Sequence, residues 1–154
     1  MWRALFESFG KPVIGLTWSG GRFSSQLTKR RVGLESLRPY ITANDAAFVS
    51  LQYEDPREEI EASKLPVRFF PETLKERDAD DLVAMIAELD GMFGVHTTAH
   101  HIRGALGLPS TVLVPYQPLW LYNFGDRIPF YQSQVYHRQR KDERWIDCVR
   151  RATQ

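Results

Sequence analysis

The residues with the clearest chemical potential follow a short apolar run at Gly91–Val95. That run is too short for a helix and predicts a buried parallel strand. His96, Thr97 and Thr98 come next, and a helical pattern then runs to Leu106, where Gly107 and Pro109 end it. In open α/β sheets, ligands bind at the carboxyl ends of strands, and the amino end of a helix there suits a phosphate. The pattern therefore predicts that His96, Thr97 and Thr98 contact an anion, with Thr97 or His96 as the helix cap.

A second polar segment follows the first predicted strand. It reads SGGRFSSQLTKRR from Ser19 to Arg31 and contains Gly20, Arg22 and Arg30, and no acidic residue occurs between Glu7 and Glu35. Glycines and small hydroxyl residues let a backbone approach an anion, and the arginines supply positive charge. The segment is either a solvated loop or an anion-binding loop, and its glycine spacing matches neither a dinucleotide fingerprint nor a Walker loop.

Three of the four histidines cluster at His96, His100 and His101. His96 and His100 stand four apart, as metal ligands on one helix face would, but His96 is predicted to precede the helix and no acid or cysteine completes a set. We therefore expect no metal site and no metal cofactor. From the residues alone, His101 is interpreted as a satisfied packing residue. No nucleophile-elbow motif indicates a hydrolase.

The segments that position these residues alternate between strands and helices. Strands are predicted at residues 12–18, 46–51, 67–70, 91–95, 111–114 and 135–137, and helices at residues 1–9, 34–41, 57–64, 82–89, 98–106 and 142–151. This alternation predicts an α/β, three-layer, Rossmann-like domain with about six mostly parallel strands in the order 3-2-1-4-5-6. Residues 1–154 would form this one domain.

Some segments admit more than one interpretation. The helix at residues 1–9, closed by Gly10, either packs on this domain or is a linker or hinge helix of a longer protein. The acidic stretch from Glu54 to Asp81 predicts a solvated face. Within it, Asp80 or Asp81 is expected to cap the following helix rather than to bind a metal.

Composition narrows the classes of protein. Hydrophobic residues make up 43% and charged residues 25% of the 154 residues, as in globular proteins, and a net charge of +1 predicts no general affinity for nucleic acid. No apolar run has the length of a membrane span, and no signal peptide is evident. The single cysteine, Cys148, excludes an internal disulfide, predicts a packing residue on a helix and favours a cytoplasmic location.

Several of these segments resemble one family. The run VHTTAHHIRGALGLP at residues 95–109 resembles the segment V-D-T-A-x-A-H-L-A-G-A-L-G-x-P in the donor-binding half of heptosyltransferase-like, GT-B glycosyltransferases, including those attached to tetratricopeptide repeats. The triplet at His96 resembles the phosphate-contacting triplet of O-linked N-acetylglucosamine transferases. WSGGR at 18–22 and KRRVGLESLRP at 29–39 resemble further motifs of the family, and FVSLQ at 48–52 is similar to its second strand.

The resemblance implies a nucleotide-sugar site. Arg30, with His96, Thr97 and Thr98, would hold the diphosphate, His101 would lie near the ribose, and Gln52 near the sugar or base. Ser19, Gly20 and Arg22 belong to the same implied site. His96 stands where the family has aspartate, which replaces a fixed anion with a neutral or cationic donor.

The aromatic segment after Pro115 departs from the family pattern. Its motif P-Y-x-P-D-W-R-W is kept at Pro115, Tyr116, Pro118 and Trp120, so Tyr116 is a candidate for substrate binding. Leu119, Leu121 and Tyr122 replace the acid, the arginine and the second tryptophan. From the residues alone, such a segment either stacks on a flat ligand or covers a core.

Three hypotheses follow. The chain is the donor half of a split or longer transferase that needs an acceptor domain, and tetratricopeptide repeats upstream in a longer chain would favour this hypothesis. Alternatively, it is a stand-alone nucleotide-binding module, or a degenerate relative that binds only a partner, including a second copy of itself. The sequence names no catalytic residue and no acceptor, and we expect the isolated chain to be inactive.

Overall fold

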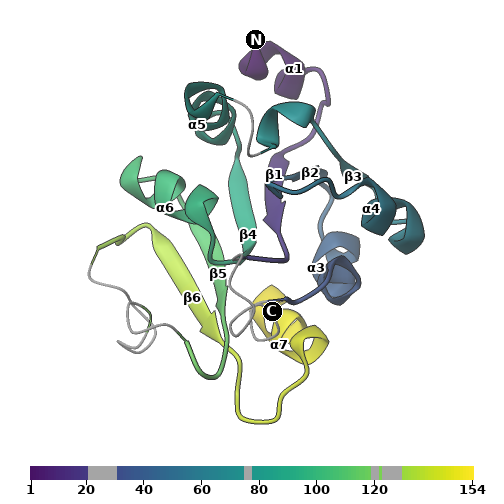
Figure 1. Ribbon diagram of the computed structural model, residues 1–154, viewed down its shortest axis with the longest axis vertical. Coiled ribbons are helices and arrows are strands. Elements are labelled where there is room, and N and C mark those ends of the chain that lie inside the picture. Colours follow the sequence, from purple (N-terminus) through teal and green to yellow (C-terminus); the bar gives the residue numbers. More distant parts are fainter. Residues whose placement is uncertain (21–30, 75–77, 119–121, 123–129) are drawn as a thin grey trace.

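The structure is a computed structural model, which describes residues 1–20, 31–74, 78–118, 122 and 130–154. Six parallel strands form one sheet in the order β3-β2-β1-β4-β5-β6 (Figure 1). The strands are β1 (Val13–Thr17), β2 (Ala47–Ser50), β3 (Val67–Arg68), β4 (Gly91–Val95), β5 (Ser110–Val114) and β6 (Gln134–Arg138). The predicted fold class and strand order are therefore confirmed, and every described strand pair is parallel.

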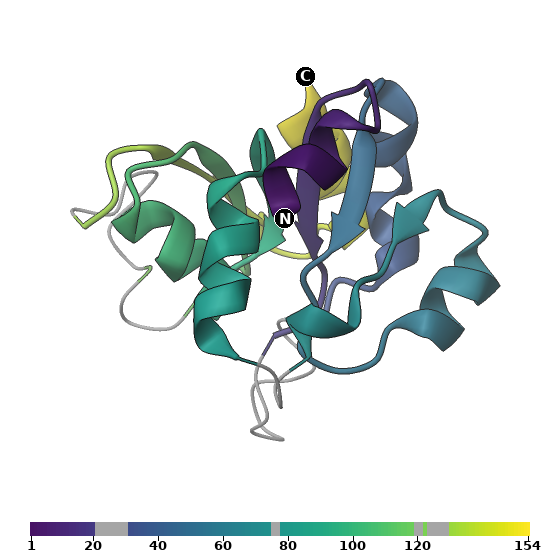
Figure 2. The ribbon, with the colours of Figure 1, turned by 90° about the horizontal axis from the view of Figure 1, so that it is seen from above.

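Helices cover both faces of this sheet, which makes three layers (Figures 1 and 2). The helices are α1 (Trp2–Glu7), α3 (Arg38–Ala43), α4 (Arg57–Ser63), α5 (Ala79–Ala87), α6 (Thr98–Ala105) and α7 (Trp145–Thr153), with 3₁₀ turns at Leu34–Leu37 and Pro71–Thr73. α1, α5 and α6 pack on one face, while α3, α4 and α7 pack on the other. No helix in the described part of the chain is long and apolar enough to cross a membrane.

The two cores are built from alternate residues of the same strands. Phe48 and Phe93 pack in the core below α3 and α7, whereas their neighbours Val49 and Met92 pack below α1 and α5. Successive side chains of a strand point to opposite faces, so a strand buried on both faces must be apolar throughout. This explains why these strands appear in the sequence as unbroken apolar runs.

The first helix belongs to the domain. Trp2 and Phe6 are buried in the core on the α5 side, and the Trp2 indole donates a hydrogen bond of 2.8 Å to the Asp81 carboxylate. The packing interpretation of residues 1–9 is thus the one that the structure shows.

Several predicted details were wrong. Asp78, not Asp80 or Asp81, caps α5, since its carboxylate accepts from the Asp80 N–H at 2.9 Å. Asp81 contacts Trp2 instead. The third strand ends at Arg68 rather than continuing to Phe70, and the last helix begins at Trp145 and not at Asp142. Cys148 is buried in the core beside α3, as expected of a packing residue.

Candidate functional site at the carboxyl ends of β1 and β4

The strand order changes direction at β1, which lies between β2 and β4. Open α/β sheets bind ligands at this switch point, beyond the carboxyl ends of the strands. Ser19 and Gly20 follow β1, Gln52 follows β2, and His96 and Thr97 follow β4. We call these five residues the switch-point group. The sheet topology therefore brings three separate sequence segments to one edge.

The β1 and β4 ends approach each other very closely. Gly94 has φ +144° and lies opposite Thr17, and a Cβ atom built on Gly94 would stand 1.8 Å from the Thr17 carbonyl oxygen. The Thr17 hydroxyl also donates to the Val95 carbonyl at 2.7 Å. A side chain at position 94 would therefore separate the two strands that carry the site.

Gly20 makes the corresponding contact one step beyond the strands. A Cβ atom at Gly20 would lie 3.2 Å from the His96 carbonyl oxygen and 3.2 Å from Thr97 Cγ2. The start of the loop after β1 thus contacts the turn before α6.

Gln52 is buried, and its side chain holds the backbone of Ser19. Its amide lies 2.6 Å from the Ser19 hydroxyl. With the amide turned over, its nitrogen donates to the Ser19 carbonyl at 3.1 Å and its oxygen accepts from the Ser19 N–H at 3.0 Å. Gln52 therefore positions the first residue of the loop, where the resemblance implies a contact with sugar or base.

The amino end of α6 presents hydrogen-bond donors. Thr97 is the N-cap residue, but its hydroxyl caps no N–H, and this buried oxygen has no hydrogen-bond partner among the described residues. Thr98 is exposed. Within the described part of the chain, the N–H groups of Thr98 and Ala99 donate no hydrogen bond, whereas His100 N–H reaches the Thr97 carbonyl at 3.0 Å. Free N–H groups and the helix dipole together favour an anion at this position.

Both ends of the basic loop are fixed at β1. Trp18 lies just before the loop and Val32 just after it, and the Trp18 carbonyl accepts a hydrogen bond of 2.9 Å from the Val32 N–H. The carboxylate of Glu59 joins the same ends, because it accepts from the Trp18 indole at 2.7 Å and from Leu34 N–H at 2.9 Å. Arg22 and Arg30 lie outside the described residues, and the described Arg31 is exposed.

Sequence reasoning missed Glu59. It belongs to the acidic stretch assigned to a solvated face, and for this residue the assignment was wrong, since Glu59 is half-buried and bonded to two distant segments. Its position on α4 carries no local signal of this role. Only the packing of α4 against the 3₁₀ turn at Leu34–Leu37 brings it to the loop.

The histidines of this region have different environments. His96 is buried, and its ring centroid lies 4.1 Å from that of Tyr122. His101 Nε2 is 2.9 Å from the Tyr122 hydroxyl, and its Nδ1 is 3.2 Å from the Tyr131 hydroxyl. Burial lowers the pKa of His101. Both ring nitrogens of His101 are therefore satisfied, and Tyr122 covers two histidines at once.

His100 is a core residue between α6 and the sheet. The Thr17 hydroxyl uses its proton on Val95, so His100 Nε2, 3.1 Å away, must donate to it, and Nδ1 then accepts from Ser110 at 3.4 Å. Burial lowers the pKa of His100 to about 3, with a smaller effect of His96. Because His96 precedes α6, the two rings do not share a helix face, and no group of three metal-binding side chains occurs among the described residues.

Tyr116 is not part of the switch-point group. It follows β5, is exposed, and lines a cavity of about 820 Å³ along β6 together with Tyr136 and Arg138. Its backbone N–H donates to Gln139 at 3.4 Å. Among the described residues, no hydrogen bond of Tyr116 involves the switch-point group.

Fold and site together define a Rossmann-like α/β domain with a helix amino end at its switch point. No family model matches the chain, and no solved structure matches it. The chain is 30% identical over 117 residues to the protein FlbA of Caulobacter vibrioides, a match that covers 73% of the chain and 20% of FlbA. The matched region thus spans about a fifth of that curated relative's length.

Proposed function

We propose that the chain is the donor-binding half of a GT-B glycosyltransferase, which binds the diphosphate of a nucleotide sugar at the switch-point group. The resemblance of residues 95–109 to the donor-half segment suggests the class of ligand. In this proposal the chain transfers sugar only with an acceptor domain, which is supplied by another protein or by another part of a longer chain.

One observation carries the proposal. At the start of α6, two backbone N–H groups and the buried Thr97 hydroxyl have no hydrogen-bond partner among the described residues, and Gly20 contacts the same turn. A buried hydroxyl without a partner costs about 1–3 kcal/mol. Phosphate oxygens would accept from all three groups and recover that cost.

The chemistry needs no metal in this arrangement. When the sugar leaves, negative charge develops on the diphosphate, and fixed N–H groups and arginines can stabilise that charge. Arg22 and Arg30 belong to a loop whose ends are fixed beside the same strands, so they are the proposed cations. The catalytic base would come from the acceptor domain, and we assign none to this chain.

Binding measurements test the proposal directly. Titration calorimetry with a panel of nucleoside diphosphates should give affinities that fall about tenfold or more in Thr97→Val and in Arg30→Ala, since hydrogen bonds to charged groups contribute about 1.5–3 kcal/mol. Thr42→Val on α3 and Arg57→Ala on α4 are matched controls, both exposed and both outside the switch-point group. Wild-type affinity in Thr97→Val and Arg30→Ala would refute the assignment.

A second candidate is a non-catalytic module that has lost nucleotide binding. The position of Tyr122 favours it, because this ring packs on His96 and its hydroxyl bonds His101, so both histidines are occupied within the protein. A folded protein that binds no member of the panel would support this candidate. If Tyr122→Ala then gained affinity, Tyr122 would be identified as the group that blocks the site.

A further inference from the structure

The edge strand β6 presents backbone groups that no described segment pairs. The Gln139 N–H donates to the Val114 carbonyl at 2.8 Å, so the backbone of Gln139 faces the neighbouring strand β5. N–H and C=O groups alternate sides along a strand, so those of Tyr136 point away from the sheet. β6 is the last strand of the described sheet, so no described strand pairs with the outward groups of Tyr136. The Arg138 carbonyl accepts from the Arg151 side chain at 2.8 Å. An open edge of this kind accepts an additional strand.

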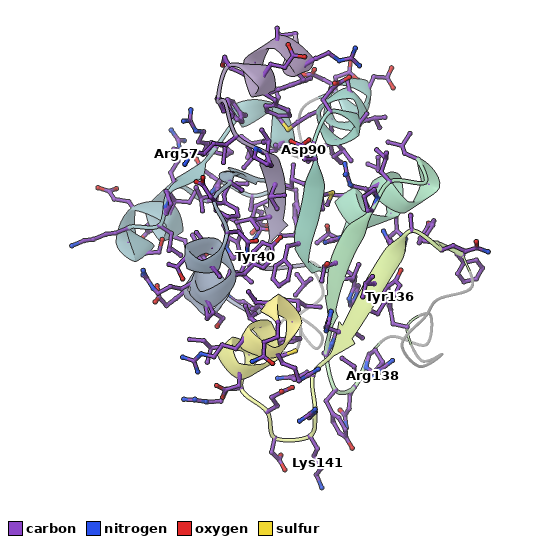
Figure 3. The ribbon with its side chains drawn as sticks, turned by 180° about the vertical axis from the view of Figure 1, so that it is seen from behind. Tyr40, Arg57, Asp90, Tyr136, Arg138 and Lys141 are labelled. Atoms are coloured by element: carbon purple, nitrogen blue, oxygen red, sulfur yellow. The ribbon has the colours of Figure 1, made fainter. Side chains whose placement is uncertain are left out.

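The same edge borders the cavity of about 820 Å³, which is strongly cationic. Its lining includes Arg138, Arg140, Lys141 and Arg151, and no carboxylate lines it among the described residues. The neighbouring Glu143 is engaged by Arg151 at 3.0 Å. Arg140 and Lys141 are exposed. Figure 3 shows that Tyr136 lies on β6, Arg138 farther along it and Lys141 in the connection to α7. A partner of negative charge fits this lining.

Apolar side chains accompany the charges. Val135 is 56% exposed and Tyr116 is 47% exposed, and both line the cavity. α7 packs against α3 (Figure 1), and Val135 on β6 stays exposed. An extended segment with alternate acidic and apolar residues would match the edge, the cations and Val135 together. A second copy of β6 would bring like charges face to face, which is unfavourable.

We propose that β6 is a docking edge for an acidic, extended peptide segment of a partner protein, which adds to the sheet as a seventh strand beside Tyr136. Its backbone pairs with the outward groups of Tyr136. Its carboxylates lie beside Arg140 and Lys141, and an apolar side chain covers Val135. This site lies on the outer edge of the sheet and is independent of the proposed donor site.

The test uses a dye-labelled peptide of alternating Glu and Val, about eight residues long, and measures fluorescence anisotropy with the full chain. We expect it to bind, and we expect the Lys–Val analogue not to bind. An analogue with N-methyl groups on alternate residues keeps the charge but cannot pair with β6, so it should lose binding. Raising salt from about 50 to 300 mM should weaken binding, because partly exposed charges are screened.

Variants locate the site. The double variant R140Q/K141Q should bind the Glu–Val peptide roughly tenfold more weakly, since it loses two exposed ion pairs with the peptide. The control R57Q/K64Q removes the same two charge types from α4 and its C-cap residue and should bind like the wild type. Equal binding of the N-methylated peptide, or of R140Q/K141Q, would overturn the proposal. It would also be overturned if the Glu–Val peptide did not bind, whether or not the chain dimerised or bound tripolyphosphate.

Discussion

At the scale of single residues, neighbouring histidines in one sequence segment have unrelated roles. His100 is enclosed between α6 and the sheet with both nitrogens bonded, while His101 contacts two tyrosines. Neither environment can be deduced from the letters HH. Each ring's partners come from strands and loops far away in the chain, such as Thr17 and Tyr131.

His100 should make the stability of the domain depend on pH. Its pKa falls from 6.5 to about 3 on folding. Between these two values, the His100 side chain binds a proton in the unfolded chain but not in the folded chain. The His100 contribution is therefore complete above pH 6.5 and decreases by about 1.4 kcal/mol per unit as the pH falls towards 3.

Urea unfolding at several pH values between 7 and 4, compared with His100→Gln, measures this slope. Glutamine keeps one donor and one acceptor for Thr17 and Ser110, so the variant should fold. Its free energy of unfolding should vary less steeply with pH than that of the wild type. An unchanged slope would show that His100 is not the group responsible.

At the scale of elements, the pairing of β1 with β4 is the contact on which the candidate site depends. Gly94 permits it, since no other residue type has room beside the Thr17 carbonyl. Glu59 and Gln52 add tertiary hydrogen bonds that fix the ends of the loop between β1 and the 3₁₀ turn. The site is therefore held by strand pairing and by side chains from α4 and the end of β2.

Gly94→Ala should destabilise the domain strongly. Its Cβ atom would meet backbone 1.8 Å away, which only a displacement of β1 or β4 can relieve, and we expect a loss of roughly 3 kcal/mol or more. The control is Gly107→Ala at φ +69°, where nothing lies within 4 Å. That variant should lose only about 1–2 kcal/mol from the backbone conformation. Equal unfolding midpoints for the two variants would contradict the close approach.

At the scale of the whole molecule, the described strands form one sheet, and the described helices form a layer on each of its faces. A GT-B transferase closes two such domains around its substrates, and much of its rate comes from positioning the acceptor and base. The described residues contain no second sheet that could provide this positioning.

We therefore predict that the purified chain does not transfer sugar by itself. Incubation with nucleotide sugars, with and without acceptors, should release no nucleoside diphosphate above the rate of a Thr97→Val control. Binding of a nucleoside diphosphate without turnover is the expected combination. Steady turnover by the isolated monomer would contradict the need for an acceptor domain.

The sequence by itself determined the fold class and the strand order. Unbroken apolar runs alternating with helical patterns admit a parallel sheet with covered faces, and right-handed crossovers restrict the order of its strands. The sequence also predicted that the segments after β1 and β4 share one edge, because parallel strands end on the same side. Turn and cap positions were less reliable, as Asp78 shows, since several nearby acids could cap the same helix.

Only the tertiary structure decided which side chains hold the site and which face it. Gln52 bonds Ser19, Glu59 bonds Trp18 and Leu34, and Tyr122 covers His96, and each of these contacts joins segments far apart in the sequence. Such contacts depend on how helices and loops pack on the sheet. Local periodicity fixes the face that an element buries, but it does not fix the partner that a polar side chain meets there.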